Sequence, residues 1–269
     1  MEEVFSFDVD DHKIIIKKVP LKLLLENDNN FNGQKLMHPF KFNDKNCYSN
    51  EFTSEGVKDD FQNIKEIHVK HDGACGLMYY DAKEKKYIPY TRYDIKKNKK
   101  TGKFGEPQDN WIECEPKPTS DGATHWAHFR SAYEDNKAYK WQIAAFDSLL
   151  ASQKLNDCTK SFTCEYMGKK CNYTKTDPVD LDSCVIPHGS LVMEVPKELH
   201  SFEGFYKLLQ SFPIIEGVVI YCEKNVYKIR RNMYADENNK RLEWDKKKTP
   251  QDYGFTIKGC SNFVIEDKN

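Results

Sequence analysis

The sequence predicts an α+β fold, in which antiparallel-rich sheets are flanked by a few helices. Three short strand-like runs follow one another at residues 66–70, 75–80 and 86–93 (EIHVK, CGLMYY and KYIPYTRY). Helical patterns occur singly between such runs and do not alternate regularly with them. Aromatic residues make up 13% of the 269-residue chain, which suits a large core and argues against disorder.

The other segments differ in how clearly their sequence indicates a helix or a strand. Residues 12–25 form a strand-like run, whereas residues 139–155 suit either a helix or a strand that leads into one. The segment 201–212 is the clearest helix, with Ser201 as its candidate N-cap. Residues 253–259 and 262–267 are strand-like. The apolar face expected for the clear helix consists of Phe202, Phe205, Leu208, Leu209 and Phe212.

Charge and hydropathy limit the classes of partner. The formal net charge is −1, so contact with a nucleic acid would require a local basic surface rather than an overall positive charge. The acidic N-terminus does not resemble a signal peptide. No apolar run approaches the roughly 20 residues that span a bilayer. We therefore expect a monomeric protein of the cytoplasm or nucleus, neither secreted nor bound to a membrane.

The nine cysteines are odd in number and include no C-x-x-C pair. This usage favours reduced, mostly buried thiols over a secreted disulfide framework. A zinc site is the alternative, but the available spacings match no familiar zinc motif. Its candidate ligands are Cys158, Cys164, Cys171 and Cys184, or Cys114 with His125 and His128.

Lys70 stands beside an Asp72-Gly73 dipeptide, and strand-like residues lie on both sides of it. Asp-Gly between two such runs is a common hairpin signal. We therefore predict a strand–turn–strand unit that reverses direction at Asp72-Gly73 and fixes Lys70 at the end of its first strand.

Residues 215–232 predict a second hairpin, with a loop at 223–225. With a loop of this length, Glu216, Lys228 and Arg230 would share one face, whereas a two-residue loop would separate Glu216 from Lys228. Basic residues here are also what an edge strand uses against aggregation. The predicted pairs are Cys222 with Val226, Ile220 with Lys228 and Val218 with Arg230.

Taken together and in this order, the motifs resemble those of covalent nucleotidyltransferases. Lys70-His71-Asp72-Gly73 matches K-x-D-G, Glu216-Gly217-Val218-Val219 matches the E-G-V-V strand, and Lys228-Ile229-Arg230 matches K-x-[KR]. The segments YKWQIAAFDSLL, TCEYMGKKCNY and VIPHGS narrow the resemblance to the vertebrate-type ATP-dependent 5′-to-3′ RNA ligase family. It covers roughly residues 65–232.

The resemblance implies a nucleotidyltransferase fold with the nucleotide between two sheets. It makes residues 1–60 a family-specific N-terminal part, 61–232 the motif-bearing core and 233–269 a C-terminal extension of a single domain. Only 41 residues follow Lys228, which disfavours a separate oligonucleotide-binding domain.

The resemblance also implies a role for each motif residue. Lys70 would become adenylylated, with Asp72 beside it, and Lys228 and Arg230 would hold the α-phosphate. Glu216 would bind Mg²⁺, or Mn²⁺ in its place. The expected nucleotide-binding residues are Val69, Lys70, Arg92, Glu165, Glu216, Lys228 and Arg230. No adenine-stacking motif is evident, and His188 is only a candidate.

The expected reaction joins RNA 5′-phosphate and 3′-hydroxyl ends. Lys70 would take AMP from ATP and pass it to the RNA 5′-phosphate, and a 3′-hydroxyl would then displace AMP. Only a neutral amine attacks phosphorus, so we expect Lys228, Arg230 and the metal to lower the pKa of Lys70. A GTP-dependent mRNA capping guanylyltransferase and a non-catalytic RNA-end-binding module are the alternatives. RNA could contact the lysines of 96–103 and of 246–248, but a solvated loop is the more common explanation of a run such as the first.

Overall fold

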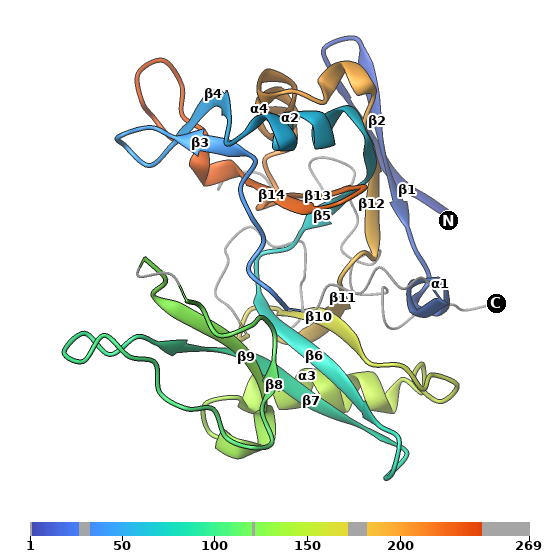
Figure 1. Ribbon diagram of the computed structural model, residues 1–269. Helices are drawn as coiled ribbons and strands as arrows, with labels where there is room; N and C mark the ends of the chain where they lie inside the picture. The colour runs from blue at the N-terminus through green and yellow to red at the C-terminus, as the bar shows by residue number, and fades with distance from the viewer. Residues whose placement is uncertain (1, 27–32, 120–121, 172–181, 244–269) are drawn as a thin grey trace.

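The computed structural model describes residues 2–26, 33–119, 122–171 and 182–243 (Figure 1). The predicted strands at 253–259 and 262–267 and the lysines of 246–248 lie outside these ranges. Two six-stranded sheets dominate the described part, and a two-stranded sheet accompanies them. All strand pairs of these sheets are antiparallel. The predicted α+β class is therefore confirmed.

The first sheet has the order β1 (Glu2–Val9), β2 (His12–Lys18), β12 (Leu191–Glu194), β5 (Ile64–Lys70), β13 (Gly217–Cys222), β14 (Val226–Arg230). The second has the order β11 (Cys184–Pro187), β10 (Phe162–Met167), β6 (Ala74–Asp81), β7 (Lys86–Lys96), β9 (His125–Ser131), β8 (Ile112–Glu113). The small sheet pairs β3 (Phe40–Phe42) with β4 (Tyr48–Phe52).

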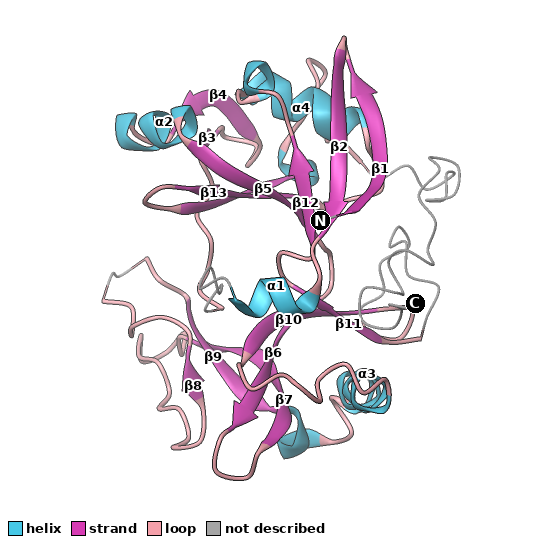
Figure 2. Cartoon of the chain, turned by 90° about the vertical axis from the view of Figure 1, so that its right-hand side faces the viewer, coloured by secondary structure: helices cyan, strands magenta, loops and turns pink. Residues whose placement is uncertain are grey.

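The three longer helices flank the two large sheets on their outer sides. α2 (Glu55–Gln62) and α4 (Phe202–Ser211) lie beyond the first sheet, on the side away from the second, and α3 (Lys140–Ala151) lies against the second sheet (Figures 1 and 2). The short α1 (Leu21–Glu26) follows β2, so the run at 12–25 is a strand and then a helix. Short 3₁₀ turns are Ala132–Asp135, Lys197–Leu199 and Arg231–Met233.

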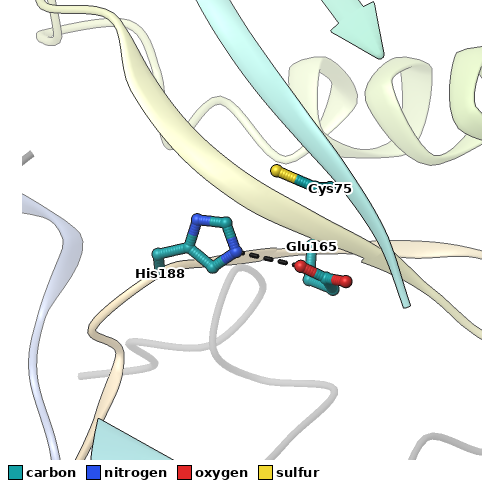
Figure 3. Close-up of side chains that lie close together, drawn as sticks. All are labelled: Cys75, Glu165 and His188. Atoms are coloured by element: carbon teal, nitrogen blue, oxygen red, sulfur yellow. Dashed lines mark hydrogen bonds and ion pairs between the residues drawn. The ribbon is translucent and has the colours of Figure 1, made fainter. Parts of the chain in front are cut away.

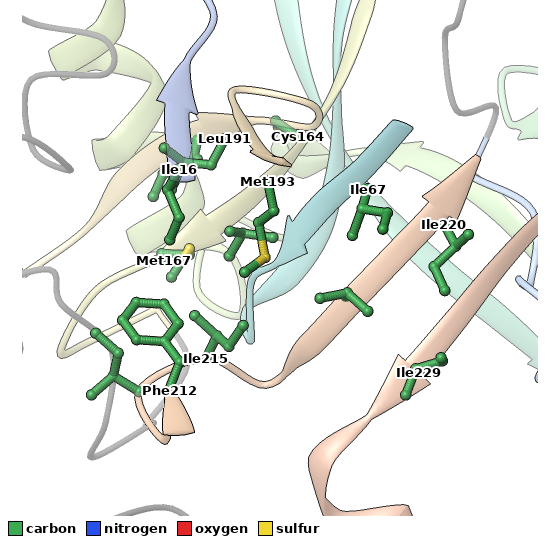
Figure 4. Packing of buried hydrophobic residues seen from close by; sticks show 14 of the residues in the cluster. Ile16, Ile67, Cys164, Met167, Leu191, Met193, Phe212, Ile215, Ile220 and Ile229 are labelled. Carbon is green, nitrogen blue, oxygen red and sulfur yellow. The ribbon is translucent and has the colours of Figure 1, made fainter. Parts of the chain in front are cut away.

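The predicted helix at 201–212 forms as expected. The Ser201 side chain accepts a hydrogen bond from the Gly204 amide and caps the first turn. Four of the five residues of its predicted apolar face are fully buried, and Phe202 is partly exposed. The core they join spans both sheets, and Figure 4 shows part of it, including residues from three neighbouring strands of the first sheet. Those residues are Ile67, Ile220 and Ile229.

Two short connections carry the chain between the sheets. Residues 71–73 lead from β5 in the first sheet to β6 in the second, and residues 188–190 lead from β11 back to β12. The predicted hairpin at Asp72-Gly73 is therefore wrong, because β5 and β6 do not pair. Lys70 pairs with Gly217 in one sheet, and Ala74 pairs with Tyr166 in the other.

The second hairpin exists, but its predicted register is wrong by one residue. Gly217 lies opposite Arg230 and Val219 lies opposite Lys228. The Cys222 amide donates to the Asn225 carbonyl at 2.9 Å and so closes the turn instead of pairing with β14. β13 consequently begins at Gly217, one residue after Glu216.

Gly73 makes the tightest demand on the first connection. A Cβ atom at this position would lie 2.5 Å from both Glu165 Cγ and the Tyr166 carbonyl oxygen. Glycine is therefore required where the connection reaches β10, for reasons of space.

We expect Gly73→Ala to lower the free energy of unfolding by about 1–3 kcal/mol, because the added methyl group overpacks against β10. Urea denaturation measures this change. Gly105→Ala is the matched control, since its nearest neighbouring atom would be 3.8 Å away. Equal effects of the two substitutions would contradict the close approach.

Candidate functional site

Three adjacent strand ends bring together residues that the sequence places far apart. Lys70 ends β5, Arg230 ends β14, and Glu216 immediately precedes the strand between them. The carboxylate of Glu216 is buried and forms ion pairs with both neighbours, through Oε2 to Lys70 Nζ and through Oε1 to Arg230 Nε at 2.7 Å. The observed register gives the face of Lys228 and Arg230 to Gly217 and Val219, so the predicted sharing of one face by Glu216, Lys228 and Arg230 is wrong. Glu216 instead reaches Lys70 and Arg230 from the position just before the strand begins.

Lys228 extends this cluster along β14. It lies on the same face of the strand as Arg230, two residues away. Burial, together with the nearby charges of Lys70, Arg230, Lys35 and Arg92, lowers the pKa of Lys228 to about 8. An excess of positive charge around a half-buried lysine favours an anion such as a phosphate. The ion pairs of Glu216 are with Lys70 and Arg230, and no contact with Lys228 is seen.

The protonation of Lys70 differs from the expectation. Burial and the charge of Arg230 act to lower its pKa, but the carboxylates of Glu216 and Glu165 outweigh them and raise it above its ordinary value. The predicted lowering is therefore wrong for this ion-paired arrangement. Lys70 is held as a cation as long as Glu216 is its partner.

Asp72 lies next to this group of charges. Burial and the negative charges of Glu216 and Glu165 outweigh the positive charges of Lys70 and Arg230 and together raise the pKa of its carboxyl from 3.8 to about 6. Ionisation of Asp72 is unfavourable because two other carboxylates lie nearby, and a bound cation would lower this cost.

Glu165 ties the two connections between the sheets together. Its Oε1 accepts a hydrogen bond from the Gly73 amide at 3.1 Å, and its Oε2 lies 2.9 Å from His188 Nε2. The side chain is buried, and its neighbours His188, Lys70 and His71 hold its pKa below the ordinary value against the effect of burial. Glu165 is therefore an ionised carboxylate with fixed partners on both crossings.

A cavity of about 150 Å³ lies against these residues. Five of the residues predicted from sequence line it, and Asp72, Glu216 and Arg230 are not among its lining residues. Val69 belongs to the hydrophobic core as well, because its side chain is buried. Arg92 is held by Asp94, with Nε 3.1 Å from Oδ1. The five are Val69, Lys70, Arg92, Glu165 and Lys228.

A second cavity of about 770 Å³ adjoins the first, and four residues line both: His68, His188, Gly189 and Tyr221. The rings of His68 and Tyr221 lie 4.4 Å apart at 38°. The candidate His188 is present, but its Nε2 already faces Glu165. Sequence reasoning did not select the His68–Tyr221 pair, since an alternating strand gives no sign of which aromatic rings border a cavity.

The N-terminal part also contributes, which the sequence did not indicate. Gln34 and Leu36 line the smaller cavity, and the Lys228 amide donates to the Met37 carbonyl at 2.9 Å. The Tyr48 hydroxyl accepts from the Arg230 amide at 3.3 Å and so holds β14 in place. No spacing in residues 33–48 marks these contacts in advance.

The chain matches no known family model, and a search of curated proteins finds no significant relative. Among the described residues, no helix is long and apolar enough to cross a membrane. None of the eight cysteines of the described part forms a disulfide, and five of them are buried, as expected.

We expect Asp72→Asn to stabilise the protein at pH 7. The raised pKa means that the folded state holds a proton on Asp72 that the unfolded state releases between pH 3.8 and about 6, so the wild type loses stability as pH rises through this window. Asparagine cannot ionise, so the variant should gain about 1–2 kcal/mol above pH 6 after allowance for solvent screening. Near pH 4 the gain should shrink towards zero. Urea denaturation at pH 4.5 and 7 measures it, and a gain of equal size at both would contradict the raised pKa.

Proposed function

We propose that the protein is an ATP-dependent RNA ligase that joins 5′-phosphate and 3′-hydroxyl ends through a lysyl-AMP intermediate. The observation that carries the proposal is the pairing of Lys70 with Glu216 at one strand end, beside an excess of basic side chains and a cavity. The sequence motifs put the same residues in the same roles.

The first step would be attack by Lys70 on ATP. The lone pair of its neutral Nζ forms a bond to the α-phosphorus while the bond from that phosphorus to the pyrophosphate oxygen breaks, and the nitrogen releases one of its two protons to solvent. Lys228, Arg230 and Arg92 would neutralise the phosphates and the departing pyrophosphate.

Lys70 must first become neutral, and the structure suggests how. Burial and Arg230 already favour the neutral amine, and the negative charges of Glu216 and Glu165 are what keep it protonated. When Glu216 turns to another cation, the pKa of Lys70 should fall. Glu216 and Asp72 are hard oxygen donors that fit Mg²⁺ or Mn²⁺, which would neutralise the triphosphate charge.

The two adjoining cavities suit a nucleotide. Phosphates would lie in the smaller one beside Lys70 and Lys228, and the base would extend towards the His68–Tyr221 pair and the larger one. The size of the larger cavity is within the usual range for a small-molecule site, roughly 300–1,000 Å³. The AMP would then pass to an RNA 5′-phosphate and be displaced by a 3′-hydroxyl.

The absence of disulfides among the eight cysteines of the described part is consistent with a reducing compartment, such as the cytoplasm or the nucleus. RNA contact would come from local basic surface. Lys96, Lys99 and Lys100 are exposed at and after the end of β7 and remain candidates.

Radiolabelled ATP and GTP separate the proposal from its alternatives. With a divalent metal, we expect ATP but not GTP to label the protein covalently, and the labelled protein to seal nicked or open RNA. Lys70→Ala should lose both reactions and remain folded, whereas the control Lys86→Ala, an exposed lysine of β7, should keep both. Labelling by GTP alone would indicate the guanylyltransferase, and RNA binding without labelling would indicate the non-catalytic module.

The lowered pKa of Lys228 gives a second test. Metal-free ATP affinity should fall roughly eightfold between pH 7.5 and 9, because above its pKa of about 8 Lys228 must take up a proton before it can bind phosphate. Lys70 does not titrate in this range, since its pKa is raised. Calorimetry measures the affinity, and Lys228→Arg, which stays charged, should remove the slope. A slope that persists in this variant would exclude Lys228 as its source.

A further inference from the structure

Three potential metal ligands converge beside the candidate nucleotide site. Among the described residues, Cys75, Glu165 and His188 place one ligand atom each within 4.8 Å of the other two (Figure 3). Cys75 on β6 lies directly opposite Glu165 on β10, so the two side chains share one face of the second sheet. His188 reaches them from the connection between β11 and β12.

The chemistry of the three donors is selective. A thiolate, an imidazole and a carboxylate are the ligands that zinc takes in proteins, whereas magnesium prefers oxygen alone. Metal–ligand bonds of about 2.0–2.3 Å place the ligand atoms of a tetrahedral site roughly 3.3–3.8 Å apart, so small side-chain rotations would bring the three atoms to this spacing. The group therefore differs in kind from the carboxylates of Glu216 and Asp72.

The surrounding hydrogen bonds prepare Glu165 to act as a ligand. Its Oε1 is fixed by the Gly73 amide, which leaves Oε2 as the oxygen facing His188. A bound ion would replace the proton shared between Oε2 and Nε2 at 2.9 Å. Support of a metal-binding carboxylate by a hydrogen bond to its other oxygen is the usual outer-shell arrangement.

We propose that Cys75, Glu165 and His188 form a binding site for a thiophilic divalent ion, with Zn²⁺ as the ion that fits the donor set best. On binding, the Cys75 thiol releases its proton to solvent and the sulfur donates an electron pair to zinc, so no oxidation or reduction takes place. Three protein ligands leave one position of a tetrahedral site open.

The position of this site gives it a regulatory consequence. All three residues line the cavity that also holds Lys70, Arg92 and Lys228. Zinc would occupy part of this small cavity and engage Glu165, one of the expected nucleotide-binding residues, so zinc and nucleotide should exclude each other. This consequence rests on the proposed function, whereas zinc binding itself does not.

Zinc binding is tested on the full-length, metal-free protein, by competition with a chromophoric zinc chelator and by Co²⁺ substitution. We expect one tight site and a thiolate-to-cobalt charge-transfer band. Cys75→Ser should abolish the band and weaken zinc binding by at least tenfold. Cys158→Ser, a half-buried thiol outside the cluster, should change neither. A Cys75→Ser protein that folds and binds zinc as tightly as the wild type would overturn the proposal, as would a wild type without the band.

The regulatory consequence needs a separate measurement. Labelling of the protein by ATP in excess Mg²⁺ should fall as Zn²⁺ is added and recover as ATP is raised. The Cys75→Ser variant, compared with its own zinc-free rate, should resist zinc at least tenfold better. If zinc binds but no labelling occurs even in Mg²⁺, the proposed function fails and the zinc site stands. If labelling occurs but is equally zinc-sensitive in both proteins, the regulatory consequence is wrong.

Discussion

The hydrogen bonds of Glu165 are the constraint on which the arrangement of the site depends. The chain passes between the two large sheets at residues 71–73 and 188–190, and this one buried carboxylate accepts from the first crossing and faces His188 on the second. Both connections are short, so fixing them also fixes how the end of β5 faces the second sheet. Lys70 stands at that end. Its direction therefore depends on a residue that is far away in sequence and belongs to the opposite sheet.

Acidic and basic side chains are concentrated around Lys70. Glu216 pairs with both Lys70 and Arg230, and Glu165, Asp72 and Lys228 lie close enough for these groups to shift one another's pKa. Such groups shift one another's pKa and cost folding free energy unless they are fully paired. Their concentration at the junction of two sheets and beside two cavities is typical of a functional site.

The sequence predicted the elements well where local chemistry determines them. The Ser201 cap and the apolar face of α4 are encoded within a dozen residues, and the strands β5, β6 and β7 follow from their composition. Prediction from the sequence failed where contacts between distant parts of the chain determine which strands pair. Asp-Gly favours a hairpin, but the pairing of Lys70 with Gly217 and of Ala74 with Tyr166 draws the two strands into different sheets. Similarly, the turn of the second hairpin includes Cys222, whose amide donates to the Asn225 carbonyl, and the strands pair one residue away from the predicted register.

In the candidate site, too, the motif residues could be predicted from the sequence, whereas the contributions that depend on tertiary contacts could not. The motifs selected Lys70, Glu216 and Arg230, and the structure brings these three together. The contributions of Met37, Tyr48 and Cys75 arise from segments without any motif, so only the folded chain reveals them. The protonation of Lys70 was also beyond the sequence, because it depends on which carboxylate reaches the amine.

Peptide mapping by mass spectrometry, after the protein has been incubated with ATP and Mg²⁺, tests the central claim most directly. The account predicts a single AMP group on the peptide that contains Lys70, attached through a phosphorus–nitrogen bond that acid cleaves and mild base does not. An AMP group on a different residue, or an unmodified Lys70 peptide from a protein that demonstrably binds ATP, would contradict it.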